Sequence, residues 1–221
     1  MDRFFHTELT GLRNDLILMG EYALDMLRLS ARALAEADLA LAHRVRGMDD
    51  SVDEMEKRVD REVMRYITLF GPMGRDIRTL LAARDIGHEL ERIADEAAVI
   101  ARRVITIGER GVLNDFLHVP RMAQLAENQV RLSLDSFVEL DLAKAGAVRP
   151  GDAEIDRLHR ENYEQIFGHP GESRSVPAPV VELMFISKGY ERAGDHAKNI
   201  AEQVIFLTSG EDVRHRHGVA P

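Results

Sequence analysis

Apolar residues recur every three or four positions along the chain, and this periodicity constrains the fold more than any other feature. Between residues 4 and 37 the stripe is formed by Leu9, Leu12, Leu16, Met19, Ala23, Met26 or Leu27, Ser30 and Leu34. This spacing is typical of one buried face on a long α-helix. No comparable stretch alternates with the period of two that a half-buried β-strand shows. The sequence therefore predicts an all-α protein.

Two further helices are predicted in the first half of the chain. Asp38 can cap a helix that continues to about Phe70, where the sequence "FGPMG" interrupts the pattern. A third helix is predicted from about Arg75 to Gly108. The inner face of the second helix is predicted to carry Val45, Val52, Met55, Val59, Val63, Tyr66 and Ile67. Because long helices joined by short turns pack antiparallel, these three should form a bundle.

The second half of the chain repeats the first. The phrase "ERIADEAAVIARRVI", which starts at Glu91, returns as "ERAGDHAKNIAEQVI" at Glu191, with eight of fifteen positions identical. Unrelated helices would share about one position in such a stretch. Six long helices in two tandem three-helix bundles are therefore predicted, related by pseudosymmetry and meeting near the connection at 108–115. The predicted boundaries are 1–112 for the first repeat, 113–210 for the second and 211–221 for a polar C-terminal tail.

Composition excludes several classes of function. The formal net charge of -9 argues against a nucleic-acid surface, since binding to phosphates requires clustered lysine and arginine. The absence of cysteine excludes disulfides, thiolate zinc sites and thiol nucleophiles. No signal peptide is recognisable, and no apolar run approaches the ~18 residues of a membrane-spanning helix. We expect a soluble, cytoplasmic protein that neither inserts into a membrane nor binds nucleic acid.

Pairs of acidic residues four positions apart recur in register in both halves. Side chains at this spacing lie on one face of a helix, with Cβ atoms about 5 to 6 Å apart. If the helices that carry them are antiparallel neighbours, four carboxylates converge in each half, and a cation would relieve their repulsion. Oxygen ligands of this kind suit Mg²⁺, Mn²⁺, iron or Ca²⁺, and Zn²⁺ is also compatible. The two sets are Asp49, Asp53, Glu91 and Asp95, and Asp152, Asp156, Glu191 and Asp195.

Other interpretations of these residues stay open. The pairs can instead be solvated helix faces or surface salt bridges, with Arg92 and Arg192 as neighbouring partners. His196 can be an ordinary surface histidine. Asp85 with His88 has a spacing similar to that of di-iron bundles, but those use Glu-x-x-His, which this chain lacks. A carboxylate-bridged oxidase or a metal-dependent phosphatase is therefore the alternative, although the sequence offers no phosphate-binding glycine loop and no activated nucleophile.

Several of these motifs together resemble those of the PhoU family, regulators of phosphate transport. The matching stretches are "DDSVDEMEKRV", "PMGRDIRTLL", "ERIAD" and "ERAGDHAKNIAE", and the resemblance covers essentially the whole chain. It implies two three-helix bundles that bind multinuclear metal clusters through paired carboxylates, here the two sets given above. The implied metal is divalent or multinuclear and is iron, zinc, manganese or magnesium.

The resemblance also implies a function and partners. It implies a non-enzymatic negative regulator of the phosphate-starvation response, which modulates phosphate uptake by acting with the phosphate ABC transporter ATPase and the sensor histidine kinase. A cytoplasmic homodimer is implied as well. Further ligands or outer partners of the metal sites are suggested at His196, Asn199, Glu202 and Glu96.

The two halves differ at positions close to the paired carboxylates. Asn199 and Glu202 correspond to Val99 and Arg102 in the first half, and His196 corresponds to Glu96. Pro150 precedes Asp152 in the second half, and a proline inside a helix costs about 3 kcal/mol unless a kink or break accommodates it. The two metal sites are therefore predicted not to be equivalent.

Overall fold

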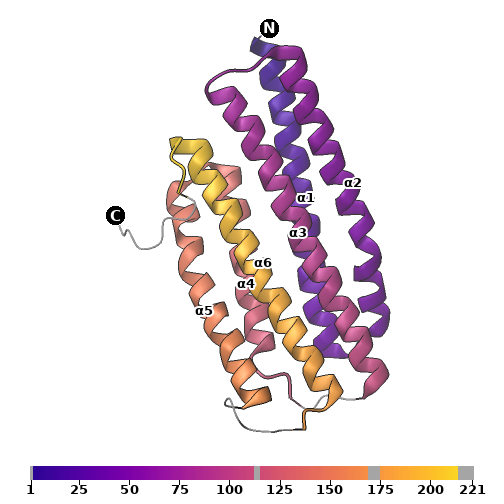
Figure 1. The fold of residues 1–221 in the computed structure, drawn as a ribbon. Coiled ribbons are helices and arrows are strands. Elements are labelled where there is room, and N and C mark those ends of the chain that lie inside the picture. The colour runs from indigo at the N-terminus through magenta and orange to yellow at the C-terminus, as the bar shows by residue number, and fades with distance from the viewer. Residues whose placement is uncertain (1, 112–114, 169–174, 214–221) are drawn as a thin grey trace.

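The computed structural model describes residues 2–111, 115–168 and 175–213, and this part of the chain contains six α-helices and no β-strand. The helices are α1 (Asp2–Glu36), α2 (Leu39–Phe70), α3 (Arg75–Arg110), α4 (Val119–Glu139), α5 (Leu142–Phe167) and α6 (Ala178–Ser209). The first three pack together as one bundle and the last three as another, as Figure 1 shows. The predicted all-α architecture of two three-helix bundles is confirmed.

The two bundles contact each other chiefly through α3 and α6, which form the most extensive helix pair in the described chain. The contact is antiparallel: Glu89 of α3 meets His196 of α6, whereas Glu182, near the start of α6, binds the end of α3. Glu182 is only 6% exposed and accepts hydrogen bonds from Arg103 at 3.2 Å and Arg110 at 2.9 Å. The halves therefore meet along these helices, and not only near the chain connection as the repeat suggested (Figure 1).

Helix ends follow the local sequence signals. Asp38 caps α2 as predicted, since its side chain accepts a hydrogen bond from the Leu41 amide at 2.9 Å. Asp141 caps α5 in the same way. Gly71 ends α2 with a φ of +53°, a left-handed conformation that glycine adopts without a steric penalty.

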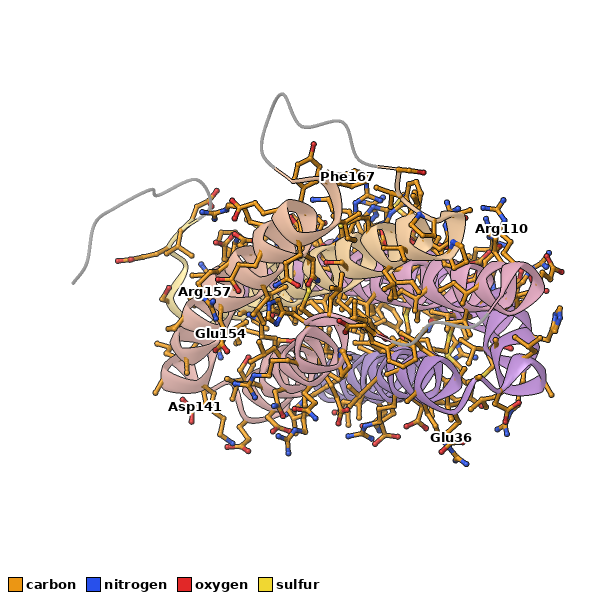
Figure 2. The ribbon with its side chains drawn as sticks, turned by 90° about the horizontal axis from the view of Figure 1, so that it is seen from below. Glu36, Arg110, Asp141, Glu154, Arg157 and Phe167 are labelled. Atoms are coloured by element: carbon orange, nitrogen blue, oxygen red, sulfur yellow. The ribbon has the colours of Figure 1, made fainter. Side chains whose placement is uncertain are left out.

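The core lies on the faces that the periodicity predicted. Leu16, Met19 and Met26 on α1 are completely buried. Val52 on α2 and Ile86 on α3 are completely buried as well. The exceptions are Leu9, Met55 and Ile67, which are only partly buried and pack at the margin of the core. Figure 2, an end-on view, shows side chains filling the space between the helices, while Glu36 and Arg157 lie on the outside.

Pro150 lies inside α5 without ending it, and α5 continues to Phe167. Beside the proline, Gln129 of α4 is buried and its side chain donates a hydrogen bond to the Val148 carbonyl at 3.2 Å. This polar contact ties α5 to α4 where the regular backbone bonding of the helix is interrupted.

The predicted domain boundary between residues 112 and 113 lies outside the described residues, as does most of the predicted tail 211–221. These boundaries stay predictions. Among the helices that the structure describes, none is sufficiently long and apolar to span a membrane.

Candidate metal centre

The first set of carboxylates converges between α2 and α3. Burial raises the pKa of Asp49 to about 6, and the charges of Asp95 and Asp53 add to the rise. Burial also raises the pKa of Glu91 to about 7, with a further contribution from the charge of Asp95. Because these charges act on one another, the four side chains that the sequence paired face the same region between α2 and α3. In the described chain, the ligand atoms that lie within 4.8 Å of one another are those of Glu56, His88 and Glu91.

Glu56 and His88 extend this cluster beyond the residues predicted from the paired carboxylates. His88 Nδ1 lies 3.0 Å from Glu56 Oε1, and one ligand atom from each of Glu56, His88 and Glu91 lies within 4.8 Å of the others. A signal was present in the sequence, because Glu56 follows Asp53 by three positions and His88 precedes Glu91 by three. We call the set of Asp49, Asp53, Glu56, His88, Glu91 and Asp95 the first cluster.

Two arginines act on the first cluster: the charge of Arg102 opposes the rise in the pKa of Asp49, and Arg92 approaches from the edge. Arg92 Nε lies 3.4 Å from Glu91 Oε2, and Arg92 Nη1 lies 3.3 Å from Asp95 Oδ2. The salt-bridge interpretation therefore holds for Arg92, but its side chain is 48% exposed, so solvent screens these contacts. Glu91 Oε2 itself is buried and accepts no hydrogen bond from the described part of the chain, and the equivalent Glu191 Oε2 of the second set is in the same state. A buried carboxylate oxygen without a donor is what a metal ligand would leave when the metal is absent.

The second set of carboxylates converges between α5 and α6. Burial raises the pKa of Asp156, and the charges of Asp152, Glu191 and Asp195 raise it further. We call these four residues the second cluster. Unlike the first cluster, the second cluster contains a lysine ammonium group. Lys198 of α6 has its Nζ 2.7 Å from Asp152 Oδ2 and 3.3 Å from Asp195 Oδ1.

The suggested additional ligands lie mainly at the contact between α3 and α6. His196 Nδ1 lies 2.7 Å from Glu89 Oε2, and the Asn199 amide donates a hydrogen bond to the same oxygen at 3.2 Å. Glu96 accepts a hydrogen bond from Arg192 at 3.2 Å. These polar groups thus join the two bundles.

The fourth suggested residue, Glu202, is buried on α6. Roles of His196, Asn199, Glu96 and Glu202 at a metal stay predictions.

The donors of the first cluster fit a divalent cation. Carboxylate oxygens suit Mg²⁺ and Mn²⁺, and an added imidazole nitrogen also suits iron and Zn²⁺. A cation held here would contact the Glu91 oxygen that accepts no hydrogen bond from the described residues and would reduce the mutual repulsion among the acids.

The raised pKa values of Asp49 and Glu91 make the folding stability of the metal-free protein depend on pH. Both pKa values lie above their ordinary values of 3.8 and 4.5, so the folded state binds these protons more tightly than the unfolded state. The resulting stabilisation is complete below about pH 4 and is lost as the pH rises through about 6 and 7. In EDTA, we expect the melting temperature of wild type to fall more between pH 5 and pH 8 than that of Asp49→Asn. Equal falls in the two proteins would contradict the repulsion described here.

Comparison with known proteins decides the family. The sequence profile of the PhoU domain matches the chain twice, over residues 16–104 and 119–204. The chain belongs to the PhoU family. The two family matches coincide with the two three-helix bundles, so the internal repeat is a tandem of PhoU domains.

Relatives of known sequence and structure support the same assignment. The chain is 32% identical over 212 residues to the phosphate-specific transport system accessory protein PhoU homolog of Pseudomonas aeruginosa, covering 96% of this chain and 88% of that protein. It is 35% identical over 209 residues to the PhoU homolog of Xylella fastidiosa, covering 95% and 87%.

Among solved structures, the crystal structure of PhoU from Pseudomonas aeruginosa aligns with a TM-score of 0.86, at 32% identity, over 94% of this chain and all of that one. The phosphate transport system regulatory protein PhoU from Streptococcus pneumoniae aligns with a TM-score of 0.85, at 25% identity, over 95% and 99%.

Proposed function

We propose that this protein is a negative regulator of the phosphate-starvation response and a modulator of phosphate uptake. The observation that carries the proposal is the agreement in sequence and fold, over nearly the whole chain, with a phosphate-specific transport system accessory protein. The proposed partners are the ATPase of the phosphate ABC transporter and the sensor histidine kinase. The long exposed helical faces of this protein would bind these partners and transmit the phosphate status of the cell by direct contact.

A divalent metal is part of the proposal. Residues Asp49, Asp53, Glu91 and Asp95 would hold it in the first bundle, with Glu56 and His88 as further ligands supported by their position. The bound ion would supply positive charge and cross-links between α2 and α3. Asp152, Asp156, Glu191 and Asp195 are the corresponding residues of the second bundle. The family resemblance further leads us to propose a cytoplasmic homodimer.

A metal-dependent hydrolase is the second candidate. The observation that favours it is the mixed group of Glu56, His88 and Glu91, since carboxylate and imidazole ligands are also used by hydrolytic metal sites. The regulator is the better-supported candidate because its relatives by sequence and by structure carry accessory or regulatory names.

Deletion of the gene distinguishes the two candidates. In cells that carry the phosphate transporter and the sensor kinase, we expect deletion to switch on phosphate-starvation genes in rich phosphate, and a plasmid copy to repress them again. The purified, metal-loaded protein should hydrolyse phosphate esters far more slowly than ~1 s⁻¹, the lower end of typical enzyme turnover. Normal repression after deletion, together with turnover at that rate, would favour the hydrolase.

A further inference from the structure

The two clusters occupy equivalent positions in the two bundles but differ in their neutralising groups. Lys198 corresponds to Ala98 in the first half, just as Asp195 corresponds to Asp95, at an offset of one hundred residues. Ala98 is almost completely buried and has no charge to offer. The same backbone position therefore presents an ammonium group in one bundle and a methyl group in the other.

Lys198 bridges the two helices that build the second cluster. Its Nζ lies 2.7 Å from Asp152 on α5 and 3.3 Å from Asp195 on α6. The corresponding acids of the first bundle, Asp49 and Asp95, interact with each other. Arg92 approaches Asp95 at 3.3 Å and the charge of Arg102 acts on Asp49, but in the described part of the chain no cation bridges the two acids as Lys198 does. The ammonium group thus lies between the same two carboxylates whose repulsion a metal would relieve.

A second lysine neutralises the other end of the second cluster. Lys188 stands at the position equivalent to His88, and its Nζ lies 2.5 Å from Glu191 Oε2. That oxygen is buried and accepts no hydrogen bond from the described residues, so the charge of Lys188 is what balances it. The position of Glu56 is taken by His159, whose Nδ1 lies 2.8 Å from the Ser187 hydroxyl. Two groups that can bind a metal in the first cluster are therefore replaced by a cation and by an imidazole that contacts a hydroxyl.

We infer that Lys198 closes the second cluster to divalent cations, so that the first cluster is the metal centre of this chain. The inference rests on the metal binding of the proposed function. A divalent ion entering between Asp152 and Asp195 would compete with the ammonium for both carboxylates and would repel it at short range. The lysine side chain is 28% exposed, so its charge is only partly screened by solvent.

Manganese binding to the full chain tests the inference. After removal of metal with EDTA and dialysis against Mn²⁺, bound manganese per chain is measured by mass spectrometry and by electron paramagnetic resonance. Lys198→Met removes the charge and keeps a long unbranched side chain. We expect this variant to bind about one more Mn²⁺ per chain than wild type. The additional ion should be lost again when Asp195→Asn is combined with Lys198→Met.

Lys144→Met is the matched control, because Lys144 forms an ion pair with Glu139 near the start of α5, and the other acids that act on it, Asp135 and Asp141, belong to neither cluster. It makes the same change in charge and should bind no additional manganese. Lys198→Ala, which installs the residue of the first half, is a second variant in case methionine prevents folding. The inference is overturned if both Lys198 variants fold and bind no more manganese than wild type.

The proposed metal site is tested separately in the same assay. In a chain that retains Lys198, replacing Asp49 and Asp95 by asparagine should abolish manganese binding. Replacing Asp152 and Asp195 by asparagine should leave it unchanged. Loss of manganese in the second pair would overturn the closure of the second cluster. Manganese binding that survives the first pair would instead refute the assigned metal site, whatever the Lys198 variants show.

Discussion

Replacing Asp49 and Asp95 together by asparagine is expected to change thermal stability in opposite directions without and with Mn²⁺. In EDTA at pH 8, the variant should melt at a higher temperature than wild type. The reason is that burial and mutual repulsion raise the pKa of Asp49 to about 6, so that ionisation at pH 8 costs stability in the folded state. Neutral amides of nearly the same size remove this cost.

With Mn²⁺ the order should reverse. Wild type gains stability by mass action, by about 2.7 kcal/mol when free metal is a hundred times its dissociation constant. For a chain of this size, that corresponds to a rise of about 5 to 10 °C in melting temperature. The variant lacks two carboxylate ligands and should gain little. Differential scanning calorimetry with and without Mn²⁺ measures both effects.

The control for this experiment is Asp25→Asn with Asp135→Asn. These two exposed acids lie on α1 and α4, so the variant has the same change in net charge without altering either cluster. It should follow wild type in both conditions. If the Asp49, Asp95 variant shows the same metal-dependent rise as wild type, these residues do not hold the ion.

Gly189→Leu is expected to destabilise the protein by about 3 kcal/mol, because overpacking a close helix contact forces neighbouring side chains and backbone to move. A Cβ atom at Gly189 would lie 2.8 Å from Ile100 Cγ1 and 3.0 Å from its Cδ1. Ile100 is completely buried on α3, so it cannot turn into solvent. The substitution should therefore separate α3 from α6, the helices that join the two bundles. Urea unfolding measures the effect.

Gly146→Leu is the matched control, since a side chain at this exposed position of α5 meets no atom within 4 Å. A leucine in an exposed helix interior is more favourable than glycine, and we expect a gain of about 0.5 to 1 kcal/mol. If the two leucine variants are equally stable, the close approach of α3 and α6 is not needed for stability.

The helices and each carboxylate set could be predicted from sequence because they depend on local spacing. Apolar positions three or four apart fix a buried helix face, and Asp38 marks the start of α2 by the same local logic. Predicting that Asp49 lies near Asp95 required one additional assumption, namely that consecutive helices joined by a short turn pack antiparallel.

Contacts between the bundles could not be predicted in this way. The pairing of His196 and Asn199 with Glu89 depends on the register of α3 against α6, which no spacing within one half encodes. The role of Lys198 was hidden for a related reason. The repeat places Lys198 at the position equivalent to Ala98. Whether its long flexible side chain reaches Asp152 on the neighbouring helix depends on packing.

The most direct test of the metal centre is a crystal structure of the Mn²⁺-loaded protein with anomalous scattering measured at the manganese edge. The account predicts an anomalous peak within bonding distance of carboxylate oxygens of Asp49, Glu91 and Asp95, and none between Asp152 and Asp195. A peak at the second cluster alone, or no peak at either cluster, would contradict it.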